Sequence, residues 1–500
     1  MLATPRADLV ANTAEFENEP LIKPTGFREY DARWVFGSEL NLLGVEAMGL
    51  GLGTCFQEMG QKRVVVAHDY RSYSLSIKQA LTLGLMQAGC EVLDIGLAVT
   101  PIAYFAQFEL EAPCVAMVTA SHNENGWTGV KMGAGPPLTF GPDEMGRLKE
   151  IVLGAKGQPR PGGSLTHVHG VQERYIQDAA ARAKIRRPLK VVVACGNGTA
   201  AAFAPEAIRR MGVPVVIETD CELDYTFPRY NPNPEDHEML MAMAEAVRTH
   251  KADLALGFDG DGDRCGVVDD QGREIFADKI GLMLARDLSA LHPNSSFVVD
   301  VKSTGLFLTD PVLKANGAST VYWKTGHSYI KRKTAEIGAL AGFEKSGHFF
   351  FNPPHGRGYD DGLVAAAAIL SMLDRNPDKS LSELHDALPH AYTSLTMSPH
   401  CADETKYGVV EQIVREYEAL ASGGGRILGR AIASVLTVNG VRVTLEDGSW
   451  LLVRASSNKP ELVVVVESVS SDDDMRALFR EEVKPRLAHH PEVGAYNQEI

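Results

Sequence analysis

Short apolar runs that alternate with helical segments constrain the fold of this chain more than any other feature. Such runs open three successive stretches, at residues 63–68 (RVVVAH), 189–195 (LKVVVAC) and 296–301 (SFVVDV). Runs of this length fit strands that are buried on both faces of a mainly parallel sheet, and the segments between them fit helices that cover the sheet. The pattern predicts three similar mixed α/β domains.

The C-terminal part follows a different pattern, with short strands expected at 441–445, 451–454 and 462–466 and a helical stretch at 472–487. Tight links between these strands indicate an antiparallel sheet, and therefore a smaller α+β domain. We place the domain boundaries at 1–165, 166–272, 273–388 and 389–500. Residues 1–24 have neither a basic start nor an apolar middle, and we expect them to form a flexible leader.

The charge balance excludes several classes of partner. The chain has 49 basic and 64 acidic side chains and a net charge of −15, which argues against binding to nucleic acid or to an anionic membrane. No apolar run approaches the roughly 20 residues of a membrane span. Seven cysteines without a CxxC pair fit reduced thiols in the cytoplasm. A small anionic ligand remains possible if basic side chains converge on it.

The strongest local signal is the sequence DGDGDR at residues 259–264. Three carboxylates at alternate positions, Asp259, Asp261 and Asp263, repel one another unless a cation lies between them, and oxygen ligands suit magnesium. An EF-hand is excluded because position six is Arg264 and position twelve is Asp270. An acidic surface turn is the alternative. The loop follows a buried run, however, and α/β folds place their active sites at the carboxyl ends of strands.

A second signal is the sequence TASHN at residues 119–123, which also follows a buried run. A single serine in this position is usually a turn residue or a helix cap, and no GxSxG motif supports an esterase. Together with the aspartate loop, however, Ser121 gains a chemistry. A phosphorylated Ser121 would supply a fourth oxygen ligand to the cation, and Lys131 and Arg264 would lie near the transferring charge.

Two later loops suit a phosphorylated sugar. In EKSGH at residues 344–348, Glu344 and Ser346 can bind sugar hydroxyls, although Ser346 could instead cap a helix. The loop after residue 453 offers a phosphate cradle, or else an ordinary hairpin turn, from Arg454, Ser456, Ser457 and Asn458. Two further residues of the third stretch are candidates for the site. Lys302 follows the strand expected at 296–301, and His327 ends the sequence KTGH at 324–327, although a single histidine is usually structural.

In their order along the chain, these motifs resemble the α-D-phosphohexomutase superfamily, and the resemblance extends from about residue 27 to residue 467. DVKS at 300–303, KTGH at 324–327, EKSGH at 344–348 and FREYDAR at 27–33 are similar to the bacterial phosphomannomutase/phosphoglucomutase branch. The resemblance implies three similar α/β domains and a smaller C-terminal α+β domain around a central cleft.

The resemblance also implies a role for each candidate residue. Ser121 would carry the phosphoryl group, and its phosphate would bind one Mg²⁺ per chain together with Asp259, Asp261 and Asp263. Proton transfer or charge stabilisation would fall to Lys131, His327 and His348, with Tyr30, Arg33 and Arg264 beside them. Glu344 and Ser346 would bind O3 and O4 of the sugar, and Lys302 would face the substrate. The phosphate that is not transferred would be held by Arg454, Ser456, Ser457 and Asn458.

The expected activity is reversible transfer of phosphate between O1 and O6 of mannose or glucose. It would proceed through a hexose 1,6-bisphosphate, which would also serve as activator, in a monomer or weak dimer. Three alternatives stay open: a phosphoglucosamine or phosphoacetylglucosamine mutase, a metal-dependent sugar phosphatase, and a catalytically silent sugar-phosphate sensor. Spacing alone does not decide which of Lys131, His327 and His348 moves the proton.

Overall fold

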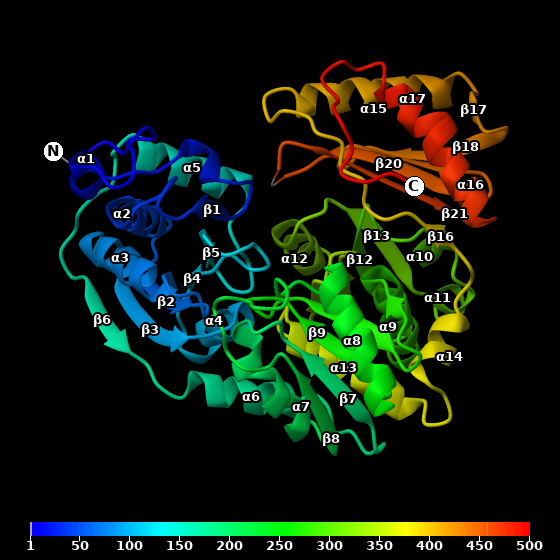
Figure 1. Cartoon of the computed structure of the whole chain (residues 1–500), viewed down its shortest axis with the longest axis horizontal. Coiled ribbons are helices and arrows are strands. Elements are labelled where there is room, and N and C mark those ends of the chain that lie inside the picture. Colours follow the sequence, from blue (N-terminus) through cyan, green and yellow to red (C-terminus); the bar gives the residue numbers. More distant parts are fainter. Residues whose placement is uncertain (1–2, 458) are drawn as a thin grey trace. The chain divides into compact units, whose positions relative to one another are not determined.

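The computed structural model describes residues 3–457 and 459–500. The chain divides into two compact units, Met1–Ala277 with Ser346–Glu383, and Asp278–Lys345 with Leu384–Ile500 (Figure 1). Among the described residues, no helix combines the length and the apolar character that a bilayer crossing requires.

The first domain is built on a six-stranded sheet with the order β1-β5-β4-β2-β3-β6. Its strands are β1 (Ala32–Val35), β2 (Arg63–His68), β3 (Glu91–Leu97), β4 (Cys114–Val118), β5 (Trp127–Ala134) and β6 (Ser164–His167). Its main helices are α2 (Leu42–Glu58), α3 (Ser74–Gln87), α4 (Thr100–Glu109) and α5 (Pro142–Leu153). Strands β2 and β4 are parallel neighbours, and His68 pairs with Val118. The segments that follow these two strands therefore leave the same edge of the sheet side by side.

The N-terminal segment is packed rather than separate from the first domain. We expected a flexible leader, whereas Leu21 and Ile22 are fully buried and a short helix, α1 (Ala14–Asn18), forms. The Asn41 side chain donates to the carbonyl of Glu19 at 2.9 Å and accepts from the backbone N–H of Leu21 at 2.9 Å. A 3₁₀ turn (Pro24–Gly26) completes the segment. The apolar residues that anchor it are too few and too irregularly spaced to show a period in the sequence.

The second domain contains a five-stranded sheet with the order β11-β10-β9-β7-β8. Its strands are β7 (Lys190–Ala194), β8 (Val215–Thr219), β9 (Leu254–Phe258), β10 (Cys265–Asp269) and β11 (Glu274–Ile275). Helices α6 (Val171–Ala181), α7 (Ala204–Arg210) and α8 (His237–His250) and a 3₁₀ turn (Thr199–Ala202) accompany it. Strand β10 runs antiparallel to β9, with Cys265 opposite Phe258. The aspartate loop is therefore the link between these two strands.

The second unit holds a parallel sheet in which β12 (Ser296–Asp300) lies between β13 (Ser319–Trp323) and β14 (Ala341–Phe343). Helices α9 (Ala277–Leu291, except its first residue), α10 (Leu306–Thr309), α11 (Pro311–Ala315) and α12 (His327–Glu336) belong to this unit, and the second half of α14 (Leu381–Asp386) does as well. Strand β15 (Phe349–Phe351) and helix α13 (Gly362–Arg375) fall within the first unit, as do most residues of the segment around them.

The C-terminal domain is an antiparallel sheet with the order β16-β21-β20-β19-β18-β17. Its strands are β16 (Tyr392–Thr393), β17 (Arg426–Ile427), β18 (Arg430–Leu436), β19 (Val441–Leu445), β20 (Trp450–Ala455) and β21 (Leu462–Ser468). Helices α15 (Lys406–Ser422), α16 (Asp472–Ala477) and α17 (Lys484–Leu487) and a π-helical turn (Leu478–Val483) lie on this sheet (Figure 1). The predicted combination of three mixed α/β domains with an α+β domain is confirmed, while the exact boundaries stay a prediction.

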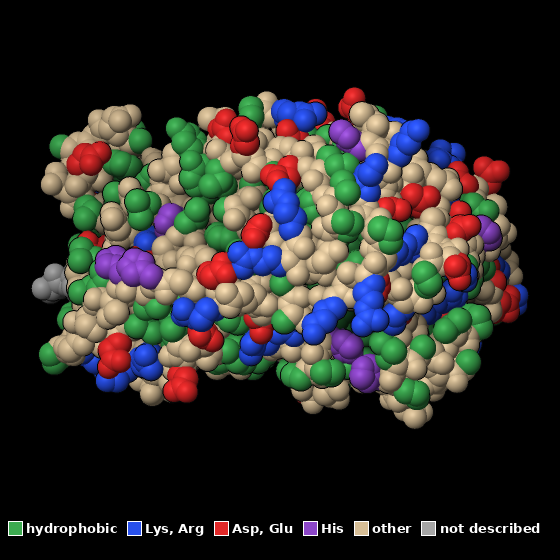
Figure 2. Space-filling view, turned by 90° about the horizontal axis from the view of Figure 1, so that it is seen from below, with side chains coloured by type: hydrophobic (Ala, Val, Ile, Leu, Met, Phe, Trp, Pro, Cys, Tyr) green, Lys and Arg blue, Asp and Glu red, His purple; other side chains and the backbone are tan. Residues whose placement is uncertain are grey.

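Charged side chains of both signs are interspersed over the face drawn in Figure 2. Such a mixture is typical of the surface of a globular protein. Three basic side chains that the sequence marked as candidate site residues are buried instead of lying on the surface. Lys131, Arg264 and Arg454 are each at most 9% exposed. Buried cations require nearby acceptors or anions, so their surroundings locate the candidate site.

Candidate active site

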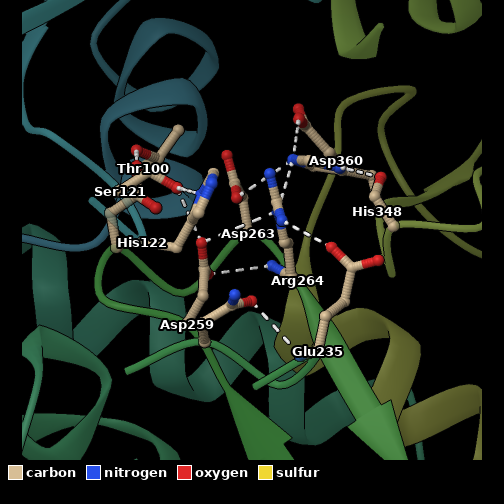
Figure 3. A network of polar contacts seen from close by, with 12 residues as sticks. Thr100, Ser121, His122, Glu235, Asp259, Asp263, Arg264, His348 and Asp360 are labelled. Carbon is tan, nitrogen blue, oxygen red and sulfur yellow. Dashed lines mark hydrogen bonds and ion pairs between the residues drawn. The ribbon is translucent and has the colours of Figure 1, made fainter. Parts of the chain in front are cut away.

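Ser121 lies beyond the carboxyl end of β4, where it meets the aspartate loop. Its Oγ donates to Asp259 Oδ2 at 2.8 Å and lies 3.3 Å from His122 Nδ1 (Figure 3). The residue is 1% exposed and adopts a φ of +51°, in the left-handed region. The serine loop and the aspartate loop, which are 138 positions apart at these two residues, therefore come together as the sequence predicted.

The two glycines of the aspartate loop permit this approach. A Cβ on Gly260 would lie 2.4 Å from the carbonyl oxygen of Ser121, so only glycine fits at this distance. Gly262 has a φ of +72°, which favours glycine as well. The three carboxylates of the loop are fully buried, and their ligand atoms lie within 4.8 Å of one another: Asp259, Asp261 and Asp263.

Lys131 compensates part of the negative charge of the loop. Its Nζ donates to Asp261 Oδ2 at 2.8 Å and also to Asp263. Burial alone would lower the pKa of Lys131, but the carboxylates outweigh it and hold that pKa above its usual value. Burial, together with repulsion from Asp261 and Asp263, raises the pKa of Asp259 to about 8. Although burial opposes it, the charge of Lys131 helps to hold the pKa of Asp261 and Asp263 below the usual range, so Asp259 is the carboxylate of the loop that the protein compensates least.

The donor set fits a hard divalent cation. Asp261 Oδ2 accepts from Thr100 Oγ1 at 2.6 Å as well as from Lys131. Asp261 Oδ1 is buried and has no hydrogen-bond partner among the described residues. A buried carboxylate oxygen without a donor is costly unless something else binds it. Three converging carboxylates with such an oxygen are the ligands that magnesium or manganese prefers.

Arg264 and His348 border the carboxylates on the side opposite Thr100 (Figure 3). Arg264 Nη1 lies 3.3 Å from Glu235 Oε2, and its Nε lies 3.9 Å from Asp259 Oδ2. His348 Nε2 lies 3.3 Å from Asp263 Oδ1. His348 of the EKSGH motif therefore lies beside the aspartate loop of the first unit, while its role in the reaction stays a prediction.

Ser346 and Arg33 are also in the first unit. Ser346 Oγ lies 3.1 Å from His348 Nδ1. Arg33, on β1, donates through Nη1 to Ala120 O at 2.9 Å and to Asn123 Oδ1 at 2.8 Å, so it supports the serine loop from behind. Tyr30, two residues before β1, is buried.

Sequence reasoning missed several residues of this site. His122 is placed 3.3 Å from Ser121 Oγ, and burial and the charges of Arg264 and Arg33 hold its pKa well below the usual range. Asp360 Oδ2 lies 3.9 Å from His348 Nε2. Others are Thr100, Asp69 and Arg71. Asp69 and Arg71 directly follow the buried strand at 63–68, so the rule that located Ser121 and Asp259 would have found them.

Of the predicted residues that the structure describes, six lie in the second unit: Lys302, His327, Glu344, Arg454, Ser456 and Ser457. Glu344 Oε1 accepts from the backbone N–H of Gly326 at 2.5 Å, directly before His327, which begins α12 and is buried. Lys302 is 9% exposed and makes no hydrogen bond or ion pair within 3–457 and 459–500. An ammonium group without a partner among the described residues is available to an anionic ligand.

The predicted phosphate loop follows β20. Arg454 Nη1 donates to Ala455 O at 2.8 Å, and Ser457 is half-buried, whereas Asn458 lies outside the described residues. The carbonyl of Ser456 accepts from Lys406 Nζ at 2.6 Å. Lys406 begins α15, and no motif in the sequence marks it as a support of this loop.

A buried arginine joins the two domains of the second unit. Arg442 Nη1 donates to Val301 O at 2.6 Å and to Ser303 O at 2.7 Å, the carbonyls on either side of Lys302. Its guanidinium carbon lies 3.6 Å from the centroid of the Trp450 ring. Arg442 of the C-terminal domain therefore fixes the backbone that carries Lys302.

The arrangement in the first unit suits phosphoryl transfer. A hydroxyl faces a cluster of carboxylates that fits a divalent cation, with Lys131 and Arg264 beside it. Phosphoryl transfer depends mainly on positioning and on neutralising the charge of the transferring group. A buried serine held beside a cation site meets both requirements, because its hydroxyl is positioned and the charge next to it can be neutralised.

Comparisons with known proteins agree with this arrangement. The phosphoglucomutase/phosphomannomutase family is matched in four parts: alpha/beta/alpha domain I at residues 24–157, domain II at 173–272, domain III at 276–392 and the C-terminal domain at 402–484. The chain therefore belongs to the phosphoglucomutase/phosphomannomutase family.

Individual relatives cover nearly the whole chain. A phosphomannomutase/phosphoglucomutase of Pseudomonas aeruginosa is 33% identical over 468 residues, 93% of this chain and 96% of the relative. A phosphoglucomutase of Neisseria gonorrhoeae is 30% identical over 442 residues, 88% of this chain and 92% of the relative. The solved structure of a phosphoglucomutase/phosphomannomutase family protein from Burkholderia thailandensis is 28% identical with a TM-score of 0.84, covering 95% and 99% of the two chains.

Proposed function

We propose that this chain is a magnesium-dependent phosphomannomutase/phosphoglucomutase that moves phosphate reversibly between O1 and O6 of mannose or glucose. The observation that carries the proposal is the 2.8 Å hydrogen bond from Ser121 Oγ to Asp259 on a loop that fits a cation. Family membership supports the same reaction, and the Pseudomonas aeruginosa relative is named for both sugars.

In the proposed cycle, phosphorylated Ser121 transfers its phosphoryl group to O6 of a hexose 1-phosphate. The product is a hexose 1,6-bisphosphate, which turns around and passes its other phosphoryl group, the one on O1, to Ser121 Oγ, leaving hexose 6-phosphate. The O6 hydroxyl loses a proton in the first transfer and O1 gains one in the second, with Lys131, His327 and His348 as the candidate proton carriers. Lys131 and Arg264 neutralise the charge of the transferring group. A bound Mg²⁺ would supply further charge neutralisation at the phosphate oxygens, held by Asp259, Asp261 and Asp263. Free hexose 1,6-bisphosphate would restore phosphorylated Ser121 and so act as activator.

Residues of the loops at 302, 344–348 and 454–458 are proposed to bind the substrate. Glu344 and Ser346 would hold O3 and O4, which exchange places when the sugar makes a half-turn, so the same side chains serve both orientations. Arg454 and the hydroxyls after it would hold the phosphate that is not reacting. Since this scheme does not bind O2, it accepts both mannose and glucose.

A phosphoglucosamine or phosphoacetylglucosamine mutase and a sugar phosphatase are the competing functions. One experiment separates them: a parallel assay of mannose, glucose, glucosamine and N-acetylglucosamine 1-phosphates with a trace of hexose bisphosphate, recording 6-phosphate and free phosphate. We expect rapid conversion of the first two, little free phosphate, and phosphoserine at Ser121 by mass spectrometry. Full turnover by Ser121→Ala would refute the role of this serine, and free phosphate formed as fast as product would favour the phosphatase.

The location and the assembly of the protein are also proposals. The seven cysteines are free thiols, which supports the reducing environment of the cytoplasm. We expect a monomer or weak dimer, and light scattering at several protein concentrations would detect a larger assembly.

A further inference from the structure

A buried ion pair lies directly behind the serine loop. It joins Arg71 Nε to Asp69 Oδ2 at 3.2 Å, and both side chains are 2% exposed. Removing two charges from water costs about as much as their attraction returns, so a buried ion pair is a poor source of stability. The contacts that the pair makes with its surroundings therefore explain it better than stability does.

Arg71 donates to three carbonyls of the serine loop. Its Nη2 lies 3.0 Å from Ser121 O and 2.6 Å from Asn123 O, and its Nη1 lies 3.1 Å from Glu124 O. A guanidinium is planar and its N–H donors have fixed directions. Arg71 therefore fixes the positions of these carbonyls relative to one another.

Asp69 holds the other side of the same loop. Its Oδ2 accepts from Thr119 Oγ1 at 2.9 Å and from the backbone N–H of Ala120 at 3.3 Å. Thr119 Oγ1 in turn accepts from the backbone N–H of Ser121 at 2.8 Å. A hydroxyl both donates and accepts, so Thr119 links the carboxylate to the Ser121 amide. Through Thr119 and Arg71, both the N–H and the carbonyl of Ser121 are held.

Ser121 needs such support because of its backbone conformation. Its φ of +51° lies in the left-handed region, which residues other than glycine, asparagine and aspartate adopt infrequently. Residues in sparsely populated conformations persist where the surrounding structure determines them fully. In this conformation Ser121 Oγ lies 2.8 Å from Asp259 Oδ2.

We infer that Asp69, Arg71 and Thr119 are positioning residues that hold the nucleophile Ser121 in its left-handed conformation with Oγ toward the aspartate loop. The inference rests on the proposed role of Ser121. Because the three side chains act through the Ser121 backbone, their loss slows phosphoryl transfer to and from Ser121 and leaves the affinity for the phosphosugar unchanged.

The first domain offers a matched control. Lys78 Nζ forms a second buried ion pair with Asp94, at 2.6 Å, and these side chains are 4% and 7% exposed. In the part of the chain that the structure describes, neither residue hydrogen-bonds to the serine loop. Lys78→Met breaks a buried pair in the same domain, as Arg71→Met does, but leaves Ser121 in place.

The test compares Arg71→Met, Thr119→Ala, Thr119→Ser and Lys78→Met with the parent protein. Steady-state kinetics give kcat and KM, and quenched reactions followed by intact-mass analysis give the rate at which hexose 1,6-bisphosphate phosphorylates Ser121. A displacement of about 1 Å in a reacting group can cost about 100-fold in rate. We therefore expect Arg71→Met and Thr119→Ala to lower kcat and the phosphorylation rate by roughly 10- to 100-fold with KM within about twofold. Thr119→Ser, which keeps the hydroxyl, and Lys78→Met should stay close to the parent.

Equal losses in Lys78→Met and Arg71→Met would overturn the inference, as would a loss in KM alone or a Thr119→Ser variant as slow as Thr119→Ala. If Arg71→Met does not fold, the threonine pair decides the question. A parent that neither turns over nor becomes phosphorylated would overturn the proposed function together with this inference. An active parent with unaffected Arg71→Met and Thr119→Ala would overturn the inference alone.

Discussion

Gly260→Ala tests whether the close approach of the two loops controls catalysis. The backbone of Gly260 is outside the left-handed region, so alanine can adopt its conformation. The added Cβ, however, would lie 2.4 Å from Ser121 O, while Cβ contacts below 3.0 Å are essentially absent from proteins and ordinary contact begins at 3.4 Å. The loops must therefore separate by about 0.6–1.0 Å, and a displacement of this size is expected to lower kcat by roughly 10- to 100-fold.

The assay is the conversion of mannose 1-phosphate at saturating Mg²⁺, with thermal unfolding measured alongside. Gly146→Ala is the control, because a Cβ at this position in α5 meets nothing within 4 Å. It should keep the parent kcat and stabilise the helix by up to about 1 kcal/mol. A Gly260→Ala variant with the parent kcat would show that the reaction does not depend on the observed separation of the loops, and the reasoning would fail.

Three further predictions concern charge and stability. Burial raises the pKa of Asp361 to about 7, so the unfolded chain loses this proton first and the free energy of unfolding should fall from about pH 4 to pH 7. Urea unfolding at pH 5 and pH 8 measures this fall, which should be smaller in Asp361→Asn than in the parent. An equal fall in the two proteins would exclude this carboxyl as its source. Lys131→Met leaves the three buried carboxylates without their ammonium, so its melting temperature should drop in EDTA and recover with Mg²⁺ by more than that of the parent; equal shifts in both proteins would contradict this. Arg442→Met removes hydrogen bonds to the carbonyls beside Lys302 and should lower the free energy of unfolding by about 2–3 kcal/mol. The exposed Arg426→Met should cost less than about 0.5 kcal/mol, and similar costs for the two variants would refute the role of Arg442.

The sequence determined where the chemistry would lie along the chain. Apolar runs in the sequence indicated the strands β4 and β9. Ser121 and Asp259 follow these runs, so the sequence placed both residues at the carboxyl ends of buried strands. The alternation of aspartate and glycine then indicated a cation site. These inferences succeed because strand burial and local turn geometry depend on residues that are close in sequence.

Which loops meet, and which side chains hold them together, became visible with the three-dimensional packing. The contact of Ser121 with Asp259 spans 138 positions, and that of Arg71 with Ser121 spans 50. No motif in the sequence indicates that Lys406 supports the phosphate loop, and no periodic pattern indicates that residues 3–24 pack on the first domain. Such contacts arise when separate sheets and helices pack together, and a side chain's partner is then fixed by distances in space that local sequence patterns do not encode.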